Sequence, residues 1–393
     1  MNYSIVPDTT VPVPSEGDWR LEIPESRRRP VRIWLWSIAG MTLLTLIVGG
    51  ITRLTQSGLS IVDWAPFMGV VPPLSEADWL RAFDAYRAFP EYLELRRGMT
   101  LDEFKFIFFW EYLHRMVARA IGFVFLIPFI WFALRGYLTR PLALRTLALF
   151  GLGAAQGAMG WFMVQSGLVD MPRVSHYRLA AHLSLAFVIF GYAVWLARDL
   201  ALTPERTALP ASLRALLRKG LLWIGGLLAL QIVWGAFVAG LKAGFYYNTF
   251  PLMGGGVFPP DFLRLEPLLV NLVENPSAVQ WVHRVLGTVL LVAVALFWLR
   301  LTRAPGLDRR SRTLNSMFAG LMGLQYLLGV ATLLLVVPVS LGVIHQTAAM
   351  ILAGVWLVWL HHVIHLEEGT PASLGLPGGA ERVGASSAGS PTY

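Results

Sequence analysis

Glu111-Tyr112-Leu113-His114-Arg115 opens a long apolar segment of the chain. If this segment is a helix, Glu111 and His114 share one face, because residues i and i+3 are neighbours on a helix surface. Ionisable side chains within an apolar span are functional candidates by default. Another stretch, Gln280-Trp281-Val282-His283-Arg284, opens a second apolar segment with the same His-Arg pair at the same offset. The sequence therefore predicts an internal duplication.

The composition is typical of a polytopic membrane protein. Of 393 residues, 55% are hydrophobic and only 14% are charged, which indicates a chain that crosses a membrane repeatedly. The formal net charge of +8 does not indicate nucleic-acid binding, because the basic residues fall in short loops between apolar segments, as the positive-inside rule predicts. The chain has no cysteine, which excludes disulfides, thiolate-bound iron, iron–sulfur clusters and cysteine nucleophiles. A bound metal would need histidine, methionine or carboxylate ligands.

Eight apolar runs are long enough to cross the ~30 Å hydrocarbon core of a bilayer as helices. They cover residues 33–52, 106–134, 142–164, 178–197, 216–241, 278–300, 314–337 and 340–364. The predicted fold class is an all-α polytopic membrane protein with eight transmembrane helices. Basic residues gather before the first run and after the second, fourth and sixth, which predicts that both termini are cytoplasmic. The first thirty residues are too acidic for a mitochondrial transit peptide, so we expect a bacterial inner membrane.

Two long loops, 53–105 and 242–277, are predicted on the outer side. The first is rich in aromatic and proline residues, a composition that favours an ordered cap over a disordered linker. Within it, Ser75 and Asp78 have the spacing of a capping box. The short helix that follows would carry aromatic residues on one face: Trp79, Phe83 and Tyr86. The tail at 367–393 is rich in Gly, Ser, Pro and Ala, and we expect it to be disordered.

The spacing of matched histidines supports the duplication. His114 and His283 are 169 residues apart, and His182 and His345 are 163 residues apart. We therefore expect two four-helix bundles related by a pseudo-twofold axis, each with a histidine on its second and fourth helices. The expected parts are a cytoplasmic N-terminal segment at 1–30 and two halves at 31–200 and 214–365.

The four histidines are candidate metal ligands. In the predicted topology their helices all run inward and each histidine lies in the first turns, so all four lie in the outer third of the bilayer at ~1.5 Å per residue. Two histidines at one depth on two helices can ligate a haem iron from opposite faces, and Gly122 and Gly287 would leave room for the ring. The alternative is that each histidine only hydrogen-bonds a neighbouring helix. His361, His362 and His365 are expected to be ordinary interfacial residues at the cytoplasmic end.

Glu111 marks a difference between the halves, since Gln280 stands in the matching place. A carboxylate beside a bound ligand can move protons or stabilise positive charge, whereas an amide can only hydrogen-bond. If only one half carries out chemistry, we therefore expect it to be the first half. The structural alternative for Glu111 is an i,i+4 ion pair with Arg115.

A set of motifs in and around the first outer loop is specific to one family. The set comprises Gly49-Gly50-Ile51-Thr52-Arg53-Leu54-Thr55-Gln56-Ser57-Gly58-Leu59-Ser60, Trp64, Pro66, Pro72-Pro73-Leu74, Pro90-Glu91-Tyr92, Glu103-Phe104-Lys105 and residues 111–115. Together they resemble the haem A synthases, in particular the alphaproteobacterial and mitochondrial type, and the resemblance extends from about residue 30 to 365. It implies an eight-helix, pseudo-twofold membrane protein that oxidises the C8 methyl of haem O to a formyl group. Successive hydroxylations and loss of water would give haem A.

The resemblance also implies roles for the histidines. His114 and His182 would ligate the iron of the substrate haem O beside a catalytic Glu111, whereas His283 and His345 would hold a permanent haem b. Compatible partners are haem O synthase, cytochrome oxidase assembly factors, an unidentified electron donor and a second copy of the chain. Some members carry a cysteine pair in the first outer loop. This chain has none, so its loop must keep its shape by packing.

Two other functions fit parts of the pattern. A dihaem b-type electron carrier that forms no product would need haems near both membrane faces, whereas these four histidines are predicted near one. A transporter with a His and Glu proton relay would need neither matched histidine pairs nor a covering loop. The pigments of the purified protein discriminate among the three: haem B with haem O or A, haem B alone, or no haem.

Overall fold

The computed structural model describes residues 23–62, 71–169, 174–201 and 208–368. Eight of its helices are long and apolar enough to cross a membrane, as predicted. They are α1 (Glu25–Leu54), α3 (Leu101–Leu134), α4 (Arg140–Val169), α5 (His176–Asp199), α6 (Ala211–Gly240), α8 (Pro276–Thr302), α9 (Arg309–Leu334) and α10 (Val339–Ile364). Shorter helices are α2 (Glu76–Arg87), the π-helix η1 (Glu91–Leu95), η2 (Ala243–Phe245), η3 (Leu268–Val270) and α7 (Asn271–Glu274). The two-residue strands β1 (Ala208–Leu209) and β2 (Glu367–Glu368) pair in parallel. The all-α fold class is confirmed.

Several helices begin or end at residues other than those predicted from hydropathy alone. The apolar run at 314–337 predicted a helix three residues too long, because Val336 and Val337 adopt left-handed φ values of 60° and 54° and Pro338 follows. Conversely, α1 begins at Glu25 rather than at residue 33. Its first turns carry basic side chains beside Glu25, which lies 3.3 Å from Arg28. A hydropathy count detects only the part of a helix that is in hydrocarbon.

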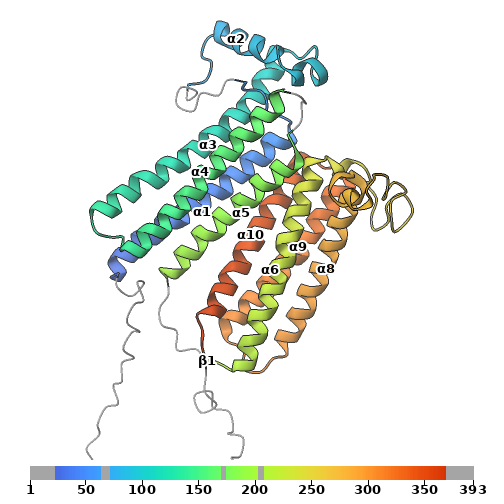
Figure 1. The fold of residues 1–393 in the computed structure, drawn as a ribbon. Helices are drawn as coiled ribbons and strands as arrows, with labels where there is room; N and C mark the ends of the chain where they lie inside the picture. Colours follow the sequence, from blue (N-terminus) through green and yellow to red (C-terminus); the bar gives the residue numbers. More distant parts are fainter. Residues whose placement is uncertain (1–22, 63–70, 170–173, 202–207, 369–393) are drawn as a thin grey trace, which may run out of the picture.

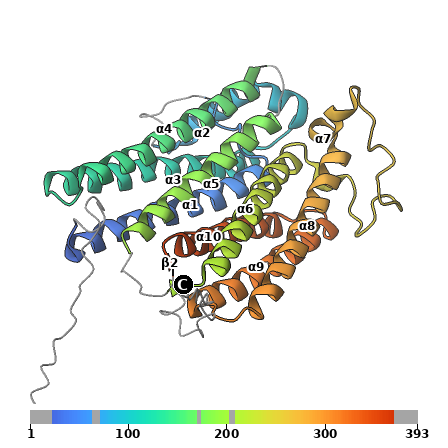
Figure 2. The same cartoon turned by 60° about the horizontal axis from the view of Figure 1, so that its bottom comes forward.

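The long helices form two groups, each from one continuous half of the chain (Figure 1). In the first, α1 packs against α3 and α5, and α5 against α4; in the second, α8 packs against α6 and α9, and α10 against α9 and α6. The groups meet where α5 contacts α6 and where α10 contacts α1 and α5, and Figure 2 shows α10 between the other helices. The pseudo-twofold relation between the groups stays a prediction.

The first outer loop forms a cap over the start of α3. Ser75 caps α2 and forms the predicted capping box with Asp78. Phe83 and Tyr86 are buried and stack on Phe104 of α3 at centroid distances of 5.0 and 5.3 Å. The ordered cap is thus confirmed for residues 71–100, whereas Trp64 and Pro66 lie outside the described residues, as does most of the tail at 367–393.

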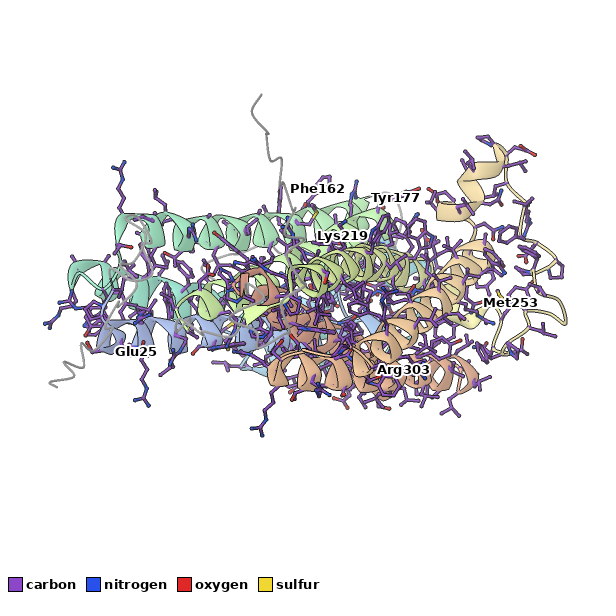
Figure 3. The ribbon with its side chains drawn as sticks, turned by 90° about the horizontal axis from the view of Figure 1, so that it is seen from below. Glu25, Phe162, Tyr177, Lys219, Met253 and Arg303 are labelled. Carbon is purple, nitrogen blue, oxygen red and sulfur yellow. The ribbon has the colours of Figure 1, made fainter. Side chains whose placement is uncertain are left out.

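The second outer loop is held by buried polar side chains. Asn271, which is fully buried, accepts from the amide of Leu265 and donates to its carbonyl, at 2.9 and 2.7 Å. Asp261 accepts from the hydroxyls of Tyr247 and Ser277, each at 2.7 Å. Figure 3 shows this loop, marked by Met253, at the opposite end of the molecule from Glu25.

Candidate functional site

Each of the four predicted histidines faces a glycine on the membrane span that precedes its own helix. A Cβ atom added to the glycine would lie 2.7 to 3.4 Å from Cε1 of the imidazole. The pairs are Gly49 with His114, Gly160 with His182, Gly235 with His283 and Gly329 with His345. Three of the four distances are 3.0 Å or less, and real Cβ atoms are almost never closer than 3.0 Å to another heavy atom. A side chain at Gly49 would therefore displace the ring, one at Gly235 or Gly329 would crowd it, and one at Gly160 would only touch it.

The histidines also pair within each half. The imidazoles of His114 and His182 interact electrostatically, and so do those of His283 and His345. Each ring is only partly buried, although each helix lies within the packed framework. The structure thus brings together the side chains that the sequence paired.

The position of the histidine along its helix agrees with prediction on three helices, whereas its depth in the bilayer stays a prediction. His182, His283 and His345 occupy the seventh or eighth residue of α5, α8 and α10. His114 is the fourteenth residue of α3, because the first turns of α3 extend beyond the apolar run and support the cap. The prediction that each histidine lies in the first turns of its helix is therefore wrong for α3.

The imidazole nitrogens have the environment of metal ligands. Nδ1 of all four rings is buried and has no hydrogen-bond partner in the described parts of the chain, a condition that costs about 1–3 kcal/mol for a buried polar atom. Three of the rings, those of His114, His283 and His345, each lie near the backbone carbonyl of the residue four positions before the facing glycine. These carbonyls belong to Thr45, Gln231 and Gln325. A small rotation would let Nδ1–H donate to that carbonyl and leave Nε2 for a metal, as metal-bound histidines favour. These residues fit a bis-histidine haem in each half.

Glutamine side chains form a further layer that sequence reasoning missed. Nε2 of Gln156 lies 3.3 Å from Nε2 of His182, and Nε2 of Gln231 lies 3.4 Å from Nε2 of His283. Gln325 donates to the backbone carbonyl of His345 at 3.1 Å. The signal was present in the sequence as a glutamine four residues before a glycine on three spans, with Thr45 before Gly49 on the fourth.

The glycines singled out from the sequence are different ones. Gly287 faces the side chain of Gln231, whose Nε2 would lie 3.0 Å from an added Cβ. Nothing in the described residues lies within 4 Å of a Cβ added at Gly122. Neither glycine faces a histidine, because the room for each ring comes from the neighbouring helix and not from its own.

Glu111 is buried under the cap and fully engaged. Its Oε2 accepts from the amide and hydroxyl of Ser60 at 2.6 and 2.7 Å and from the amide of Ile61 at 2.9 Å. Its Oε1 lies 2.5 Å from Nη2 of Arg115, which also donates to the carbonyl of Ile61 at 3.0 Å. The ion pair considered from the sequence is present, together with contacts that fix the outer loop.

In the second half, Gln280 and Arg284 stand in the matching places and hold the second outer loop through different hydrogen bonds. Gln280 donates to the carbonyl of Tyr247 at 3.1 Å. Arg284 donates to the carbonyls of Tyr247 and Thr249, at 2.7 and 2.8 Å. An amide thus donates to the outer loop where the first half uses a carboxylate that accepts. Each half fastens its loop to the helix turn just before its histidine.

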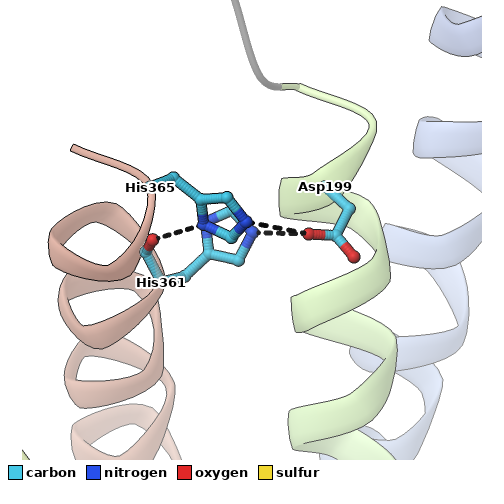
Figure 4. Close-up of side chains that lie close together, drawn as sticks. All are labelled: Asp199, His361 and His365. Atoms are coloured by element: carbon cyan, nitrogen blue, oxygen red, sulfur yellow. Dashed lines mark hydrogen bonds and ion pairs between the residues drawn. The ribbon is translucent and has the colours of Figure 1, made fainter. Parts of the chain in front are cut away.

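The histidines at the end of α10 form specific contacts that the sequence did not predict. His361 is fully buried, and its Nε2 lies 2.9 Å from Oδ1 of Asp199 on α5. His365 donates from Nδ1 to the carbonyl of His361 at 2.8 Å and faces the same carboxylate (Figure 4). Asp199 also lies 3.7 Å from Arg145. Because a histidine and an arginine already share this carboxylate, we interpret the cluster as an ion-paired contact between the halves.

Known proteins resemble this chain over nearly its whole length. A family model described as cytochrome oxidase assembly protein matches residues 32–357. A protein named heme A synthase from Rhodospirillum centenum is 48% identical over 341 residues, which cover 86% of this chain and 90% of the relative. One from Nitrosospira multiformis is 42% identical over 353 residues, 90% of this chain and 97% of the relative.

A third protein of that name, from Paramagnetospirillum magneticum, is 44% identical over 344 residues, 87% of this chain and 96% of the relative. The matched region contains all eight transmembrane helices nearly complete and all four facing His and Gly pairs. The chain therefore belongs to the cytochrome oxidase assembly protein family that includes the heme A synthases.

Proposed function

We propose that this protein is a haem A synthase, a membrane oxidoreductase that oxidises the C8 methyl group of haem O to the formyl group of haem A. The observation that carries the proposal is the set of four histidines, each opposite a glycine and paired within its half, in a chain 42–48% identical to proteins of that name. A proton-relay transporter would not need glycine at all four places.

We assign the substrate to the first half, residues 31–200, and a resident haem b to the second, residues 214–365. The carboxylate of Glu111 distinguishes the first half, where the second has Gln280. In addition, α3 and α4 are the two least buried of the eight spans. A lipophilic substrate would therefore reach His114 and His182 directly from the hydrocarbon of the membrane.

The residues of the chain position the substrate and protect it from water. His114 and His182 would hold the substrate iron, and Glu111 fastens the cap one helical turn before His114. His283 and His345 would hold haem b, which supplies electron transfer when bound. In this proposal the packed aromatic residues of the cap limit the access of water to the site. The carboxyl group of Glu111, held by Ser60, Ile61 and Arg115, is placed one helical turn from His114.

Orientation follows from the basic loops. We propose a bacterial inner-membrane protein with both termini in the cytoplasm and both histidine pairs toward the outer face. A reporter inserted near Ala88, in the cap, should be active only outside, and one fused after Tyr393 only in the cytoplasm. Reversal of both results would place the site at the cytoplasmic face.

The decisive experiment identifies the pigments of the purified protein by chromatography and mass. The proposal requires haem B together with haem O, haem A or the hydroxymethyl intermediate. It also requires that haem O supplied to the protein in membranes be converted to haem A. Haem B alone, with no conversion, would make the protein an electron carrier and refute the proposal.

A further inference from the structure

The cluster around Asp199, which joins the two halves, has the donor atoms of a metal site. One donor atom from each of Asp199, His361 and His365 lies within 4.8 Å of the other two. Imidazole nitrogens and carboxylate oxygens are ligands that zinc accepts in proteins. His361 follows His345 by 16 residues, which is about 24 Å along a helix. The cluster is therefore separate from the four histidines of the candidate haem site.

The two histidines of the cluster stand one helical turn apart at the end of α10. Residues i and i+4 share one face of a helix, and two histidines at this spacing bind zinc on the helix of many metalloproteases. The ring centroids of His361 and His365 are 4.3 Å apart. Trp195 of α5 packs edge-on against the ring of His361, at 4.9 Å between centroids. One helix thus supplies two ligands, and the packing of α5 against α10 adds the carboxylate.

The distances are close to those of a tetrahedral zinc site. Oδ1 of Asp199 lies 2.9 Å from Nε2 of His361 and 3.9 Å from Nε2 of His365. Two ligand atoms that are each about 2.0–2.1 Å from a tetrahedral zinc ion lie about 3.3 Å from one another. The observed distances lie on either side of this value, so a shift of about half an ångström in each contact would fit the ion. Water would supply the fourth ligand, as it does in zinc sites with three protein ligands.

The hydrogen bond on the other side of the His365 ring leaves Nε2 for a cation. Nδ1 of His365 donates to the carbonyl of His361 at 2.8 Å (Figure 4). In the neutral ring, Nε2 then carries a lone pair that faces a carboxylate oxygen of Asp199, which also only accepts. Two acceptors that face each other need a positive charge between them, which is either a proton or a metal ion. Metal-bound histidines commonly donate from their second nitrogen to a carbonyl in this way.

The carboxylate is held in place while one side of the cluster stays open. Arg145 lies 3.7 Å from Oδ2 of Asp199, so Oδ1 is the oxygen that faces the histidines. The side chains of Asp199 and His361 are 4% and 1% exposed, whereas that of His365 is 21% exposed. A metal ion can therefore enter past His365 and lie between buried ligands. We propose that Asp199, His361 and His365 bind one zinc ion, which links α5 of the first half to α10 of the second.

The test measures zinc in the full-length protein purified from membranes, after treatment with a chelator and addition of zinc chloride. The wild-type protein should bind one zinc ion tightly. Asp199→Asn and His365→Gln should bind it more than about 100-fold more weakly, because even the loss of a residue that only supports a ligand costs about 10- to 100-fold. X-ray absorption at the zinc edge, to which iron does not contribute, should show two imidazole ligands in the wild-type protein. His365→Gln changes a partly exposed side chain, so its fold should be kept, as circular dichroism would show.

Two control variants establish where the zinc binds. His176→Gln changes another histidine near a carboxylate, since its Nε2 lies 3.7 Å from Oε2 of Glu274. His114→Ala removes a histidine of the candidate haem site. Both variants should keep the tightly bound zinc. Tight zinc binding that persists in Asp199→Asn and His365→Gln, or that is lost in His114→Ala, would overturn the proposal.

The melting temperature separates a metal ion from a proton in the cluster. A ligand that binds only the folded protein stabilises it by mass action, so zinc should raise the melting temperature of the wild-type protein and not that of His365→Gln. A wild-type protein that binds no zinc and melts at the same temperature with and without it would refute the proposal, and a proton would then complete the contact. None of these measurements depends on the formation of haem A.

Discussion

Gly235→Ala adds one methyl group against the face of His283 and so tests the second histidine pair. The added Cβ would lie 3.0 Å from Cε1, 3.6 Å from Nδ1 and 3.9 Å from Nε2 of the imidazole. Non-bonded carbon atoms prefer about 3.5–4.0 Å, so the ring must retreat by roughly half an ångström from the place where it would ligate iron.

The magnitude follows from two opposing effects. Overpacking of this size costs about 1–3 kcal/mol, whereas alanine in place of glycine within a helix stabilises by about 0.5–1 kcal/mol. The net result is a loss of up to about 2.5 kcal/mol, or roughly 70-fold in haem affinity. The assay is the haem b content per protein after purification, with a haem titration of the depleted protein.

The same helix supplies the control. Nothing in the described residues lies within 4 Å of a Cβ added at Gly226 of α6, so Gly226→Ala should keep full haem b and unfold at a slightly higher temperature. Equal haem affinity in the two variants would show that His283 does not need the space at Gly235, and the geometric basis for ligation would be lost. A Cβ added at Gly49 would lie 2.7 Å from Cε1 of His114. Gly49→Ala should therefore slow the conversion of haem O and leave the haem b content unchanged.

Three further outcomes are expected. His283→Ala or His345→Ala should abolish the haem b absorption spectrum, and full retention of it in both variants would refute the assignment. Glu111→Gln, which copies Gln280, should retain haem b but lower conversion of haem O by about 100- to 10,000-fold; near-normal haem A would reduce Glu111 to the ion pair with Arg115. Burial raises the pKa of Asp308, the cap of α9, but hydrogen bonds from His362 and Ser311 outweigh it and bring the pKa to about 2. Because this pKa is lower than that of a free carboxyl group, the contribution of the Asp308 carboxylate to the stability of the folded protein is complete above about pH 4 and is lost as pH falls toward 2. Melting curves of Asp308→Asn should therefore lack this loss of stability in acid.

The eight spans and the four histidines could be predicted because both depend on one-dimensional pattern. Hydropathy detects the part of each helix in hydrocarbon, and the matched spacing of the histidines predicts the duplication. The glycines that face the rings could not be found in this way. Whether Gly49 or Gly122 lies opposite His114 depends on the depth and rotation of two neighbouring helices. Side-chain packing between the two helices sets both quantities, so the sequence of one helix alone does not predict them.

Glu111 illustrates the same limit at the site itself. Its ion pair with Arg115 is local and could be predicted from i,i+4 spacing. Its contacts with Ser60 and Ile61 cross fifty residues of sequence and depend on how the chain turns after α1. The partnership of His361 with Asp199 is likewise a contact between helices of different halves, so the expectation of an ordinary interfacial residue did not include it.

The position of α10 has a consequence for biogenesis. This helix follows the other seven described spans in the chain, yet it contacts α1 and α5 of the first half, carries the partner of Asp199 and leads into the strand that pairs with β1. Until it leaves the ribosome, the first half has a buried carboxylate without its histidine and an uncovered helix face. The two halves can therefore be inserted one after the other, and the contacts by which α10 locks them together form only after α10 has been synthesised. Reporter fusions made by truncation before α10 would report on an unlocked intermediate, so topology should be mapped by insertion into the full chain.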